Sequence, residues 1–401
     1  MSADRLHILA ICSLFPNVRH PHHGVFVRNR LQALSRYCEV TVVNPIPYFP
    51  FAARLARYKD YDLIPRVDSI GGLPVQHPRF FSIPRYWKTL EARTFSRVVL
   101  RAAEQLHRHR PIDLIDAHWT YPDLPAAMAC AQRFTKPMLV TIRGMEAFYK
   151  DQNDRRNSII AEGIARADRV IALSGELRDE SIAHGADPGR CVVIRNGVDT
   201  GRFVHARREQ ARAALGLEGQ GRILLSVGSL IYRKGFDRVI RALPAVLTDG
   251  EDVHLHIIGS SGPEGDYERE LRALAAEQGV AERVHFVGVV RNEGLQQWYN
   301  AADLYCLMSR GEGSPNVLTE ALACGCPAVA TRVGSVPEIM ADGVPRGTVV
   351  ENDDDFDFAG AIREMLARPF DRAAISAYMN GFDWDWCARS VLTQYRALSE
   401  N

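Results

Sequence analysis

Short apolar runs alternate with amphipathic stretches along the whole chain. This alternation is typical of parallel sheets covered by helices. It occurs twice around a boundary near residue 197, so we predict two similar doubly wound α/β domains, whose ligands would bind beyond the carboxyl ends of the strands. The runs predict strands near residues 5–11, 39–43, 113–116, 138–142, 169–173 and 191–195, and again near 222–227, 253–258, 284–287, 303–306 and 327–330.

Length and composition limit the kinds of protein that this chain can be. A chain of 401 residues has room for about two domains with their own cores, and its formal net charge of +1 provides no overall field for nucleic acid. Its eight cysteines lack paired CxxC spacing, which favours neither a zinc site nor a disulfide framework. The first apolar run is too short to span a membrane and lacks a signal-peptide cleavage pattern. We therefore expect a cytoplasmic protein.

The segment 308–338 predicts a helix start that is suited to binding phosphate. Ser314 is a favourable N-cap, Pro315 fits the first helical position, and Gly325 would end the helix. Backbone amides at a helix start point toward an anion at the positive end of the helix dipole. Here they belong to Asn316, Val317 and Leu318.

Two carboxylates flank this predicted helix start. Glu312 lies in the preceding loop, and Glu320 lies one to two turns inside the helix. A carboxylate can accept two hydrogen bonds from a vicinal diol, so one glutamate could hold a ribose and the other a hexose on either side of a diphosphate. The alternative is a capped helix whose two acids are solvated.

A second candidate anion site lies upstream. The apolar run 223–228 ends in Gly228, and Arg233 and Lys234 open the next predicted helix. Cations at a helix start oppose the helix dipole, which costs stability unless an anion binds there. The two segments together favour a site for a nucleotide diphosphate.

Several separate motifs follow one another in the order found in a known family. They are Asp116-Ala117-His118, Asn196-Gly197-Val198-Asp199 with Phe203, Arg233-Lys234-Gly235, the pair Glu312 and Glu320, and Gly334-Ser335-Val336-Pro337-Glu338. The chain resembles, over nearly its whole length, the retaining GT-B glycosyltransferases of family 4, the glycosyl transferases group 1 type. Its segment 13–35 is similar to the acceptor-side entry segment of bacterial exopolysaccharide and teichuronic-acid-type members.

The resemblance implies a GT-B fold, in which two facing Rossmann-like domains enclose an interdomain cleft. Residues 1–196 with about 384–401 would form the acceptor-binding domain, and residues 197–383 the nucleotide-sugar-binding domain. The helical tail 382–399 would cross back to pack on the first domain.

The resemblance also implies roles for single residues. Glu320 would bind the ribose and Glu312 the donor-sugar hydroxyls, while Arg233 and Lys234 would hold the diphosphate. His118 would lie beside the transferred sugar; the alternative is a strand-end histidine satisfied by local backbone. Further donor contacts are expected from Gly24, Gly228, Ser314, the three helix-start amides, and Val289 and Arg291 beside the base.

The implied reaction is a retaining transfer of a hexose from a UDP- or GDP-sugar. The acceptor would be a glycan or lipid-linked sugar in the synthesis of a bacterial surface polysaccharide or glycolipid. We expect no metal, because Asp353-Asp354-Asp355 is better explained as a solvated helix start than as an ion site. A nucleotide-sugar 2-epimerase on the same fold and an inactive nucleotide-sugar-binding scaffold remain alternatives.

Arg143 departs from the pattern of many relatives, which place a neutral polar group there. We expect it to meet an anion on the acceptor, either a lipid diphosphate or an acidic sugar; pairing with Glu146 or another acid of the loop is the alternative. Acceptor or phosphate contacts are also expected from His22, His23 and Arg28. A metal at the histidine cluster 20–23 is disfavoured, because no partner follows at ligand spacing.

The segment 48–88 interleaves aromatic and cationic residues, a pattern that suits contact with a membrane interface. The alternative is ordinary packing, with aromatics in the core and cations outside. With a lipid-linked acceptor, the first interpretation would place the protein peripherally on the cytoplasmic leaflet. The residues concerned are Tyr48, Phe49, Pro50, Phe51, Arg54, Arg57, Lys59, Arg79, Phe80, Phe81, Arg85, Tyr86, Trp87 and Lys88.

Overall fold

The chain divides into two compact units. One comprises Met1–Asn196 with Trp384–Asn401, and the other comprises Gly197–Asp383. The computed structural model describes residues 5–50, 58–82, 88–144, 154–247, 250–262, 265–341 and 343–400. Phe51, Arg54, Arg57, Arg85, Tyr86, Trp87 and Glu146, which carry several of the expectations above, lie outside these residues.

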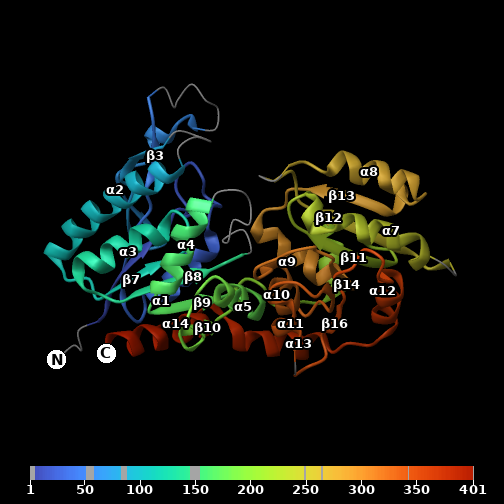
Figure 1. The fold of residues 1–401 in the computed structure, drawn as a ribbon. Coiled ribbons are helices and arrows are strands. Elements are labelled where there is room, and N and C mark those ends of the chain that lie inside the picture. The colour runs from blue at the N-terminus through green and yellow to red at the C-terminus, as the bar shows by residue number, and fades with distance from the viewer. Residues whose placement is uncertain are drawn as a thin grey trace. The chain divides into compact units, whose positions relative to one another are not determined.

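The first unit is built on an eight-stranded sheet (Figure 1). Neighbouring strands pair in parallel, except for the edge pair β4–β5. The order across the sheet is β10 (Cys191–Val193), β9 (Arg169–Ala172), β8 (Met138–Ile142), β7 (Leu114–Ala117), β1 (His7–Ile11), β2 (Glu39–Val43), β5 (Leu73–Gln76) and β4 (Val67–Ile70).

Both faces of this sheet are buried, which explains why its central strands read as continuous apolar runs. One face packs with α2, α3, α4 and α5, and the other with α1 and α14. The helices are α1 (Val25–Leu34), α2 (Lys88–His109), α3 (Asp123–Phe134), α4 (Asp154–Arg166), α5 (Gly175–Ala183) and α14 (Trp384–Ser399).

The C-terminal helix α14 packs beside α1, as the expected return of the tail to the first domain requires (Figure 1). Its Tyr395 is completely buried. The Tyr395 hydroxyl donates to Oδ2 of Asp116 at 2.5 Å. Helix α14 is therefore tied to the end of β7, where His118 lies.

The second unit contains a six-stranded sheet in which all neighbours are parallel. Its strand order, which runs 3-2-1-4-5-6 within the unit, is that of a Rossmann fold. The strands are β13 (Val284–Gly288), β12 (Val253–Ile258), β11 (Arg222–Val227), β14 (Leu304–Leu307), β15 (Ala328–Thr331) and β16 (Gly347–Val350).

Helices cover both faces of this second sheet as well. One core contains residues of α9, α10, α11 and α13, and the other contains residues of α7, α8 and α12. The helices are α6 (Arg208–Leu215), α7 (Phe236–Val246), α8 (Glu268–Glu277), α9 (Asn292–Ala301), α10 (Asn316–Ala323), α11 (Val336–Met340), α12 (Phe358–Ala367) and α13 (Arg372–Met379).

The segment after β2 contains strands that the sequence did not predict. Besides β4 and β5, it contains a two-stranded parallel ribbon of β3 (Ile46–Tyr48) and β6 (Arg79–Phe81). Phe80 is buried against the ring of Phe95. Arg79 donates to the carbonyls of Tyr61, Ile64 and His77. For Phe80 and Arg79, the structure therefore supports ordinary packing, which was the alternative to contact with a membrane.

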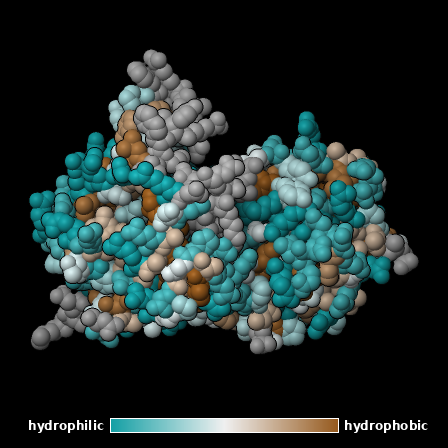
Figure 2. Space-filling view, in the orientation of Figure 1, coloured by the Kyte–Doolittle hydropathy of each residue, from teal (hydrophilic) through white to brown (hydrophobic). Residues whose placement is uncertain are grey.

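Tyr48 and Phe81 remain exposed, at 56% and 38%. Within the described residues, no helix is long and apolar enough to cross a bilayer. Hydrophilic residues dominate the face seen in Figure 2, and hydrophobic residues are scattered among them. Scattered exposed apolar residues of this kind are normal on folded proteins.

Tyr395→Phe should lower the free energy of unfolding by about 1–3 kcal/mol, because it removes a buried hydrogen bond to a carboxylate. Urea unfolding followed by circular dichroism measures this. Tyr37→Phe is the matched control, since Tyr37 is half-buried and donates to Asp385 of the same helix at 2.7 Å. Equal losses in the two variants would contradict a special role for the Tyr395 contact.

Candidate functional site

The carboxyl ends of β11 and β14 carry the predicted donor residues of the second unit. These strands are neighbours at the point where the strand order reverses. Doubly wound sheets bind their ligands at this position. Gly228 follows β11, and Glu312 lies in the loop after β14.

Arg233 and Lys234 lie in a single 3₁₀ turn, Tyr232–Lys234, before α7. The expectation that they open the helix was wrong, because Gly235 caps α7 in the left-handed conformation, with φ of 67°. A Cβ at Gly235 would overlap the carbonyl oxygen of Met308, so only glycine fits. The first turn of α7 instead contains Asp237, an acid that the helix dipole favours.

Lys234 and Glu312 form a direct ion pair. Lys234 Nζ donates to both carboxylate oxygens of Glu312, at 2.7 and 2.9 Å. Ser309 Oγ donates to Oε1 at 2.7 Å. Arg233 Nη1 lies 3.7 Å from Oε2 and donates to the Gly311 carbonyl at 2.8 Å. We call Arg233, Lys234 and Glu312 the donor cluster.

Glu312 is not a solvated acid, since only 7% of its side chain is exposed. A buried carboxylate needs such partners, because an unpaired charge in the interior costs several kcal/mol. The structure thus brings together Arg233 and Lys234, which were expected to bind the diphosphate, and Glu312, which was expected to bind the sugar. Lys234 and Arg233 are thereby held in defined positions at these strand ends.

Arg310 supports the turn that carries the donor cluster. Its guanidinium donates to both oxygens of Asp237, at 2.9 and 2.8 Å, and to the carbonyl of Tyr232 at 2.9 Å. It also lies over the Tyr232 ring, 3.9 Å from the centroid. Its backbone amide donates to the carbonyl of Arg233 at 2.7 Å. No sequence motif singled out Arg310.

Helix α10 begins at Asn316, with Pro315 as its N-cap. The prediction that Ser314 caps it was wrong, because Ser314 Oγ accepts a hydrogen bond from Ser335 Oγ at 3.0 Å. The Leu318 amide was expected to be open to phosphate, but it donates to the Pro315 carbonyl at 3.1 Å. Asn316 and Val317 do occupy the first turn of α10, and its predicted end before Gly325 is correct.

Glu320 is held inside the second unit by α9. Tyr299 is fully buried on α9, and its hydroxyl donates to Oε2 of Glu320 at 3.0 Å. Burial raises the pKa of Glu320 to about 7, although the hydrogen bond from Tyr299 opposes this shift. The alternative of a solvated acid is therefore excluded for Glu320 as well. At neutral pH a large fraction of this carboxyl group is protonated.

The residues expected beside the base lie between β13 and α9. Val289 is 75% exposed, and Arg291 is the exposed N-cap residue of α9. Within the described residues, neither is hydrogen-bonded or ion-paired to the donor cluster. Their role in reading the base therefore stays a prediction.

The acidic run before α12 is not the helix start that the sequence predicts. Helix α12 begins at Phe358, with Asp357 as its N-cap. Asp354 accepts hydrogen bonds from Arg238 at 2.6 Å and from Arg310 at 2.8 Å. Its role is that of an ionic partner. Across the described ranges, no group of three or more His, Cys, Asp or Glu side chains is placed to hold a metal ion.

His118 lies fully buried after β7 in the first unit, with both ring nitrogens facing side chains. Arg143 Nη2 lies 2.7 Å from Nδ1, and Asp116 Oδ2 lies 3.2 Å from Nε2. A guanidinium can only donate, so Nδ1 accepts and the proton is on Nε2. Burial lowers the pKa of His118, although Asp116 opposes the shift. The backbone-satisfied alternative does not hold, because the partners are side chains.

Arg30 and Arg143 place two guanidinium groups in the interior of the first unit. Arg30 is 0% exposed and Arg143 is 5% exposed. Arg30 Nη1 donates to Thr141 at 3.3 Å, while Arg143 lies over the ring of Phe26. Burial lowers the pKa of Arg143 to about 9, and nearby Arg30 adds to the shift. We call Arg30, Asp116, His118 and Arg143 the buried ionic network.

Positive charge exceeds negative charge in this network. Burial would raise the pKa of Asp116, but His118, Tyr395 and Arg30 hold it below its ordinary value, so it supplies one negative charge. Asp123, nearby on α3, accepts from the Ser13 amide, and burial raises its pKa to about 8. Within the described residues, Nε and Nη2 of Arg30, Nε and Nη1 of Arg143 and Nε2 of His118 lack hydrogen-bond partners, and one acceptor, Oδ1 of Asp116, also lacks one. Buried donors in this state favour an anionic ligand.

The remaining predicted residues of the first unit lie at the start of α1. Gly24 is its N-cap, with φ of 60°, and a Cβ there would overlap the carbonyl oxygen of Leu14. Close packing against its own chain therefore already requires glycine. His22 and His23 are exposed, and His23 stacks on His20. Arg28 donates to the side-chain carbonyl of Asn29.

Arg30 and Tyr299 were missed although the sequence holds a signal for one of them. Arg30 shares the buried face of α1 with Val27, Leu31 and Leu34, a spacing at which a cation is unexpected. Tyr299 has no such signal, because tyrosine is ordinary in a helix core. Its importance depends on α9 lying beside α10.

Two family profiles match the chain. The profile described as Glycosyltransferase Family 4 matches residues 23–202, and that described as Glycosyl transferases group 1 matches residues 207–380. A D-inositol 3-phosphate glycosyltransferase of Geodermatophilus obscurus is 31% identical over 360 residues, covering 84% of this chain and 79% of that protein. The chain belongs to glycosyltransferase family 4.

A second relative supports the same assignment of this family 4 glycosyltransferase. A D-inositol 3-phosphate glycosyltransferase of Mycobacteroides abscessus is 31% identical over 344 residues, covering 80% of this chain and 74% of that protein. The expected family is thus confirmed.

Solved structures confirm the GT-B fold of this family 4 enzyme. Sucrose-phosphate synthase from Thermosynechococcus elongatus matches with a TM-score of 0.76 and 22% identity, over 98% of this chain and 99% of that one. The HepE protein of Anabaena, solved in complex with UDP-glucose, matches with a TM-score of 0.71 and 20% identity, over 98% and 100%. At these identities the likeness shows the fold alone.

Glu320→Gln should stabilise the protein more at pH 8 than at pH 5. The pKa of Glu320 rises from 4.5 in the unfolded chain to about 7 on folding, so between these values the folded state holds a proton that the unfolded state lacks. Stability therefore falls as pH rises through this window, by up to about 3 kcal/mol. The amide of the variant cannot ionise, so the variant should lose this pH dependence.

Urea unfolding at both pH values measures the difference. Glu364→Gln, at an exposed position of α12, is the matched control and should leave the pH dependence unchanged. A Glu320→Gln variant with the pH dependence of the parent protein would show that the buried carboxyl group is not shifted.

Proposed function

We propose that this family 4 glycosyltransferase transfers a hexose, with retention of configuration, from a UDP- or GDP-sugar. The observation that carries the proposal is the donor cluster at the carboxyl ends of β11 and β14, with Glu320 on the adjoining helix. Arg233 and Lys234 would bind the diphosphate, Glu312 the sugar hydroxyls and Glu320 the ribose. The HepE protein, which was solved with UDP-glucose, supports UDP as one candidate.

The charge chemistry of the donor cluster fits departure of a nucleoside diphosphate. Negative charge grows on the diphosphate as the bond to the anomeric carbon breaks. Two oriented cations can stabilise this charge, and we propose that they do so without a metal ion. The acceptor hydroxyl would attack from the face that the phosphate leaves, and the phosphate would take its proton. This step needs no protein nucleophile.

In the first unit we propose that the acceptor carries an anionic group, which Arg143 and Arg30 recognise. The excess positive charge of the buried ionic network and its unpartnered donors support this role. The relatives are D-inositol 3-phosphate glycosyltransferases, so a phosphate-bearing polyol joins the lipid diphosphate and the acidic sugar as a candidate. We propose that His118, neutral and oriented by Arg143 and Asp116, lies beside the transferred sugar.

The product would belong to a surface polysaccharide or glycolipid. Peripheral contact with the cytoplasmic leaflet is part of this proposal, supported by the exposed rings of Tyr48 and Phe81. Membership of family 4 neither supports nor opposes this contact with the membrane.

Calorimetry with UDP, GDP and ADP, in the absence of divalent metal, tests the donor site. We expect one nucleotide to bind saturably and Glu320→Gln to weaken it about tenfold or more, since a ribose diol donates better to a carboxylate than to an amide. For the parent protein, affinity should rise between pH 6 and pH 8 as Glu320 ionises.

The control for this measurement is Glu364→Gln, which should bind as the parent does. Anomeric coupling constants in the product then report retention. Absence of binding by all three nucleotides, with or without added metal, would reject the proposed donor site.

Arg143→Gln tests the anionic acceptor. With D-inositol 3-phosphate as the probe, we expect KM to rise at least tenfold, because one of the two buried cations is lost. With myo-inositol as the neutral probe, KM should change less than twofold. An unchanged KM for the phosphorylated probe would refute the role. Equal losses for both probes would show that Arg143 acts only by orienting His118.

A further inference from the structure

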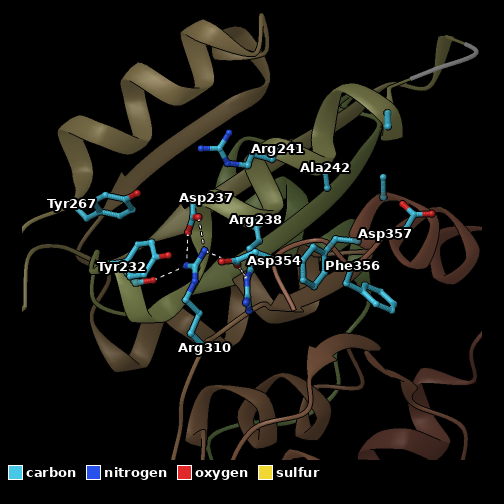
Figure 3. A pocket seen from close by; sticks show the side chains of 13 residues that line it. Tyr232, Asp237, Arg238, Arg241, Ala242, Tyr267, Arg310, Asp354, Phe356 and Asp357 are labelled. Carbon is cyan, nitrogen blue, oxygen red and sulfur yellow. Dashed lines mark hydrogen bonds and ion pairs between the residues drawn. The ribbon is translucent and has the colours of Figure 1, made fainter. Parts of the chain in front are cut away.

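A pocket in the second unit lies apart from the donor cluster. It encloses about 510 Å³ between α7, the loop before α12, and Tyr267 ahead of α8 (Figure 3). Arg233, Lys234 and Glu312 do not line it. Its volume falls within the ordinary range of small-molecule sites.

The lining of this pocket is electrically balanced. Three arginines, Arg238, Arg241 and Arg310, are matched by three aspartates, Asp237, Asp354 and Asp357. Most of these charges are already paired, since Arg310 binds Asp237 and Asp354, and Arg238 binds Asp354 at 2.6 Å. A strongly anionic ligand would meet the three carboxylates, and a cation would meet the three guanidinium groups. The balance favours a neutral ligand.

Aromatic rings supply the apolar part of the same pocket. Tyr232 is 54% exposed, and the Tyr267 ring stands nearly perpendicular to it, with the centroids 5.8 Å apart. Phe356 and Phe358 lie together on the α12 side, with their centroids 5.3 Å apart. Tyr232, Tyr267 and Phe356 are at least partly exposed and present flat apolar surface, while Phe358 is only 4% exposed and supports Phe356 from the core. The tyrosine hydroxyls retain hydrogen-bonding capacity.

A pyranose ring matches this combination. Its C–H faces can cover aromatic rings, and each of its hydroxyls can both donate and accept. The pocket is lined by both arginine donors and aspartate acceptors, which suit such hydroxyls. Arg241 is exposed and makes no ion pair with any residue that the structure describes, and in Figure 3 its guanidinium points toward the side of the pocket where Tyr267 lies. It therefore retains donors for a ligand.

We propose that this pocket binds a neutral sugar ring of a glycan, as a second carbohydrate site distinct from the donor cluster. The proposal does not depend on which donor or acceptor the enzyme uses. Tyr232 and Arg310 belong both to the pocket and to the support of the turn that carries Arg233 and Lys234. Occupation of the pocket would therefore restrain that turn.

Saturation-transfer NMR on the full chain tests the site, with methyl α-D-glucoside, methyl α-D-mannoside and maltose as probes. We expect at least one probe to bind saturably. Ala245→Trp, which fills the pocket from α7, should weaken that binding at least tenfold. Arg241→Ala, a change at an exposed position, should weaken it about threefold or more.

Two controls locate the binding. Ala273→Trp, at an exposed alanine of α8 outside the pocket, should bind the probe as the parent does. Glu312→Gln should change this binding less than twofold, because Glu312 does not line the pocket. Circular dichroism of each variant confirms that it is folded.

Other outcomes overturn the proposal. Loss of sugar binding in Glu312→Gln, with retention in Ala245→Trp and Arg241→Ala, would place the sugar at the donor cluster. Tighter binding of glucose 6-phosphate than of methyl α-D-glucoside, with the same dependence on Ala245 and Arg241, would show an anion site. Absence of binding by all three neutral probes would reject a carbohydrate site, whatever the nucleotide measurements give.

Discussion

The parallel pairing of β11 with β14 is the constraint on which the donor cluster depends. Parallel neighbours end at the same edge of a sheet, so the loop after β11 and the loop after β14 must meet there. Lys234 and Glu312, which are far apart in the sequence, thereby form one partly buried ion pair. The pair is stable because Ser309 and Arg233 supply further contacts to the carboxylate. Arg310 then fixes the turn from the other side.

The first unit also brings charged groups together at the ends of neighbouring strands. The ends of β7 and β8 bring His118 beside Arg143, and α1 and α14 add Arg30 and Tyr395 from opposite ends of the chain. Every member is buried, so each charge depends on its neighbours. The result is a buried arrangement with more cationic than anionic charge. Such an arrangement costs stability in the absence of a ligand, which is the usual sign of a site shaped by function.

Much of the fold could be predicted because parallel strands buried on both faces read as apolar runs. All eleven strands expected from the sequence occur, within a few residues of their predicted ends. The strands β3, β4, β5, β6 and β16 were missed, because edge and ribbon strands are short and partly exposed. Helix starts were predicted less well. Ser314 failed as a cap, and Gly235 displaced the start of α7, because both depend on neighbours from other segments.

The sequence by itself determined the class of this protein: two α/β halves, the family, and Arg233, Lys234, Glu312 and Glu320 as the chemically informative residues. The two halves follow from periodicity. The family and the four residues follow from motifs that resemble those of a known family, and both kinds of signal are local properties of the chain. Only the tertiary structure decided which groups are paired. It placed Tyr299 on Glu320, Arg143 on His118, and Arg30 in a core, because these contacts join segments whose distance in space is set by sheet order and helix packing. Charge balance and pKa depend on such contacts, so the sequence could not show them.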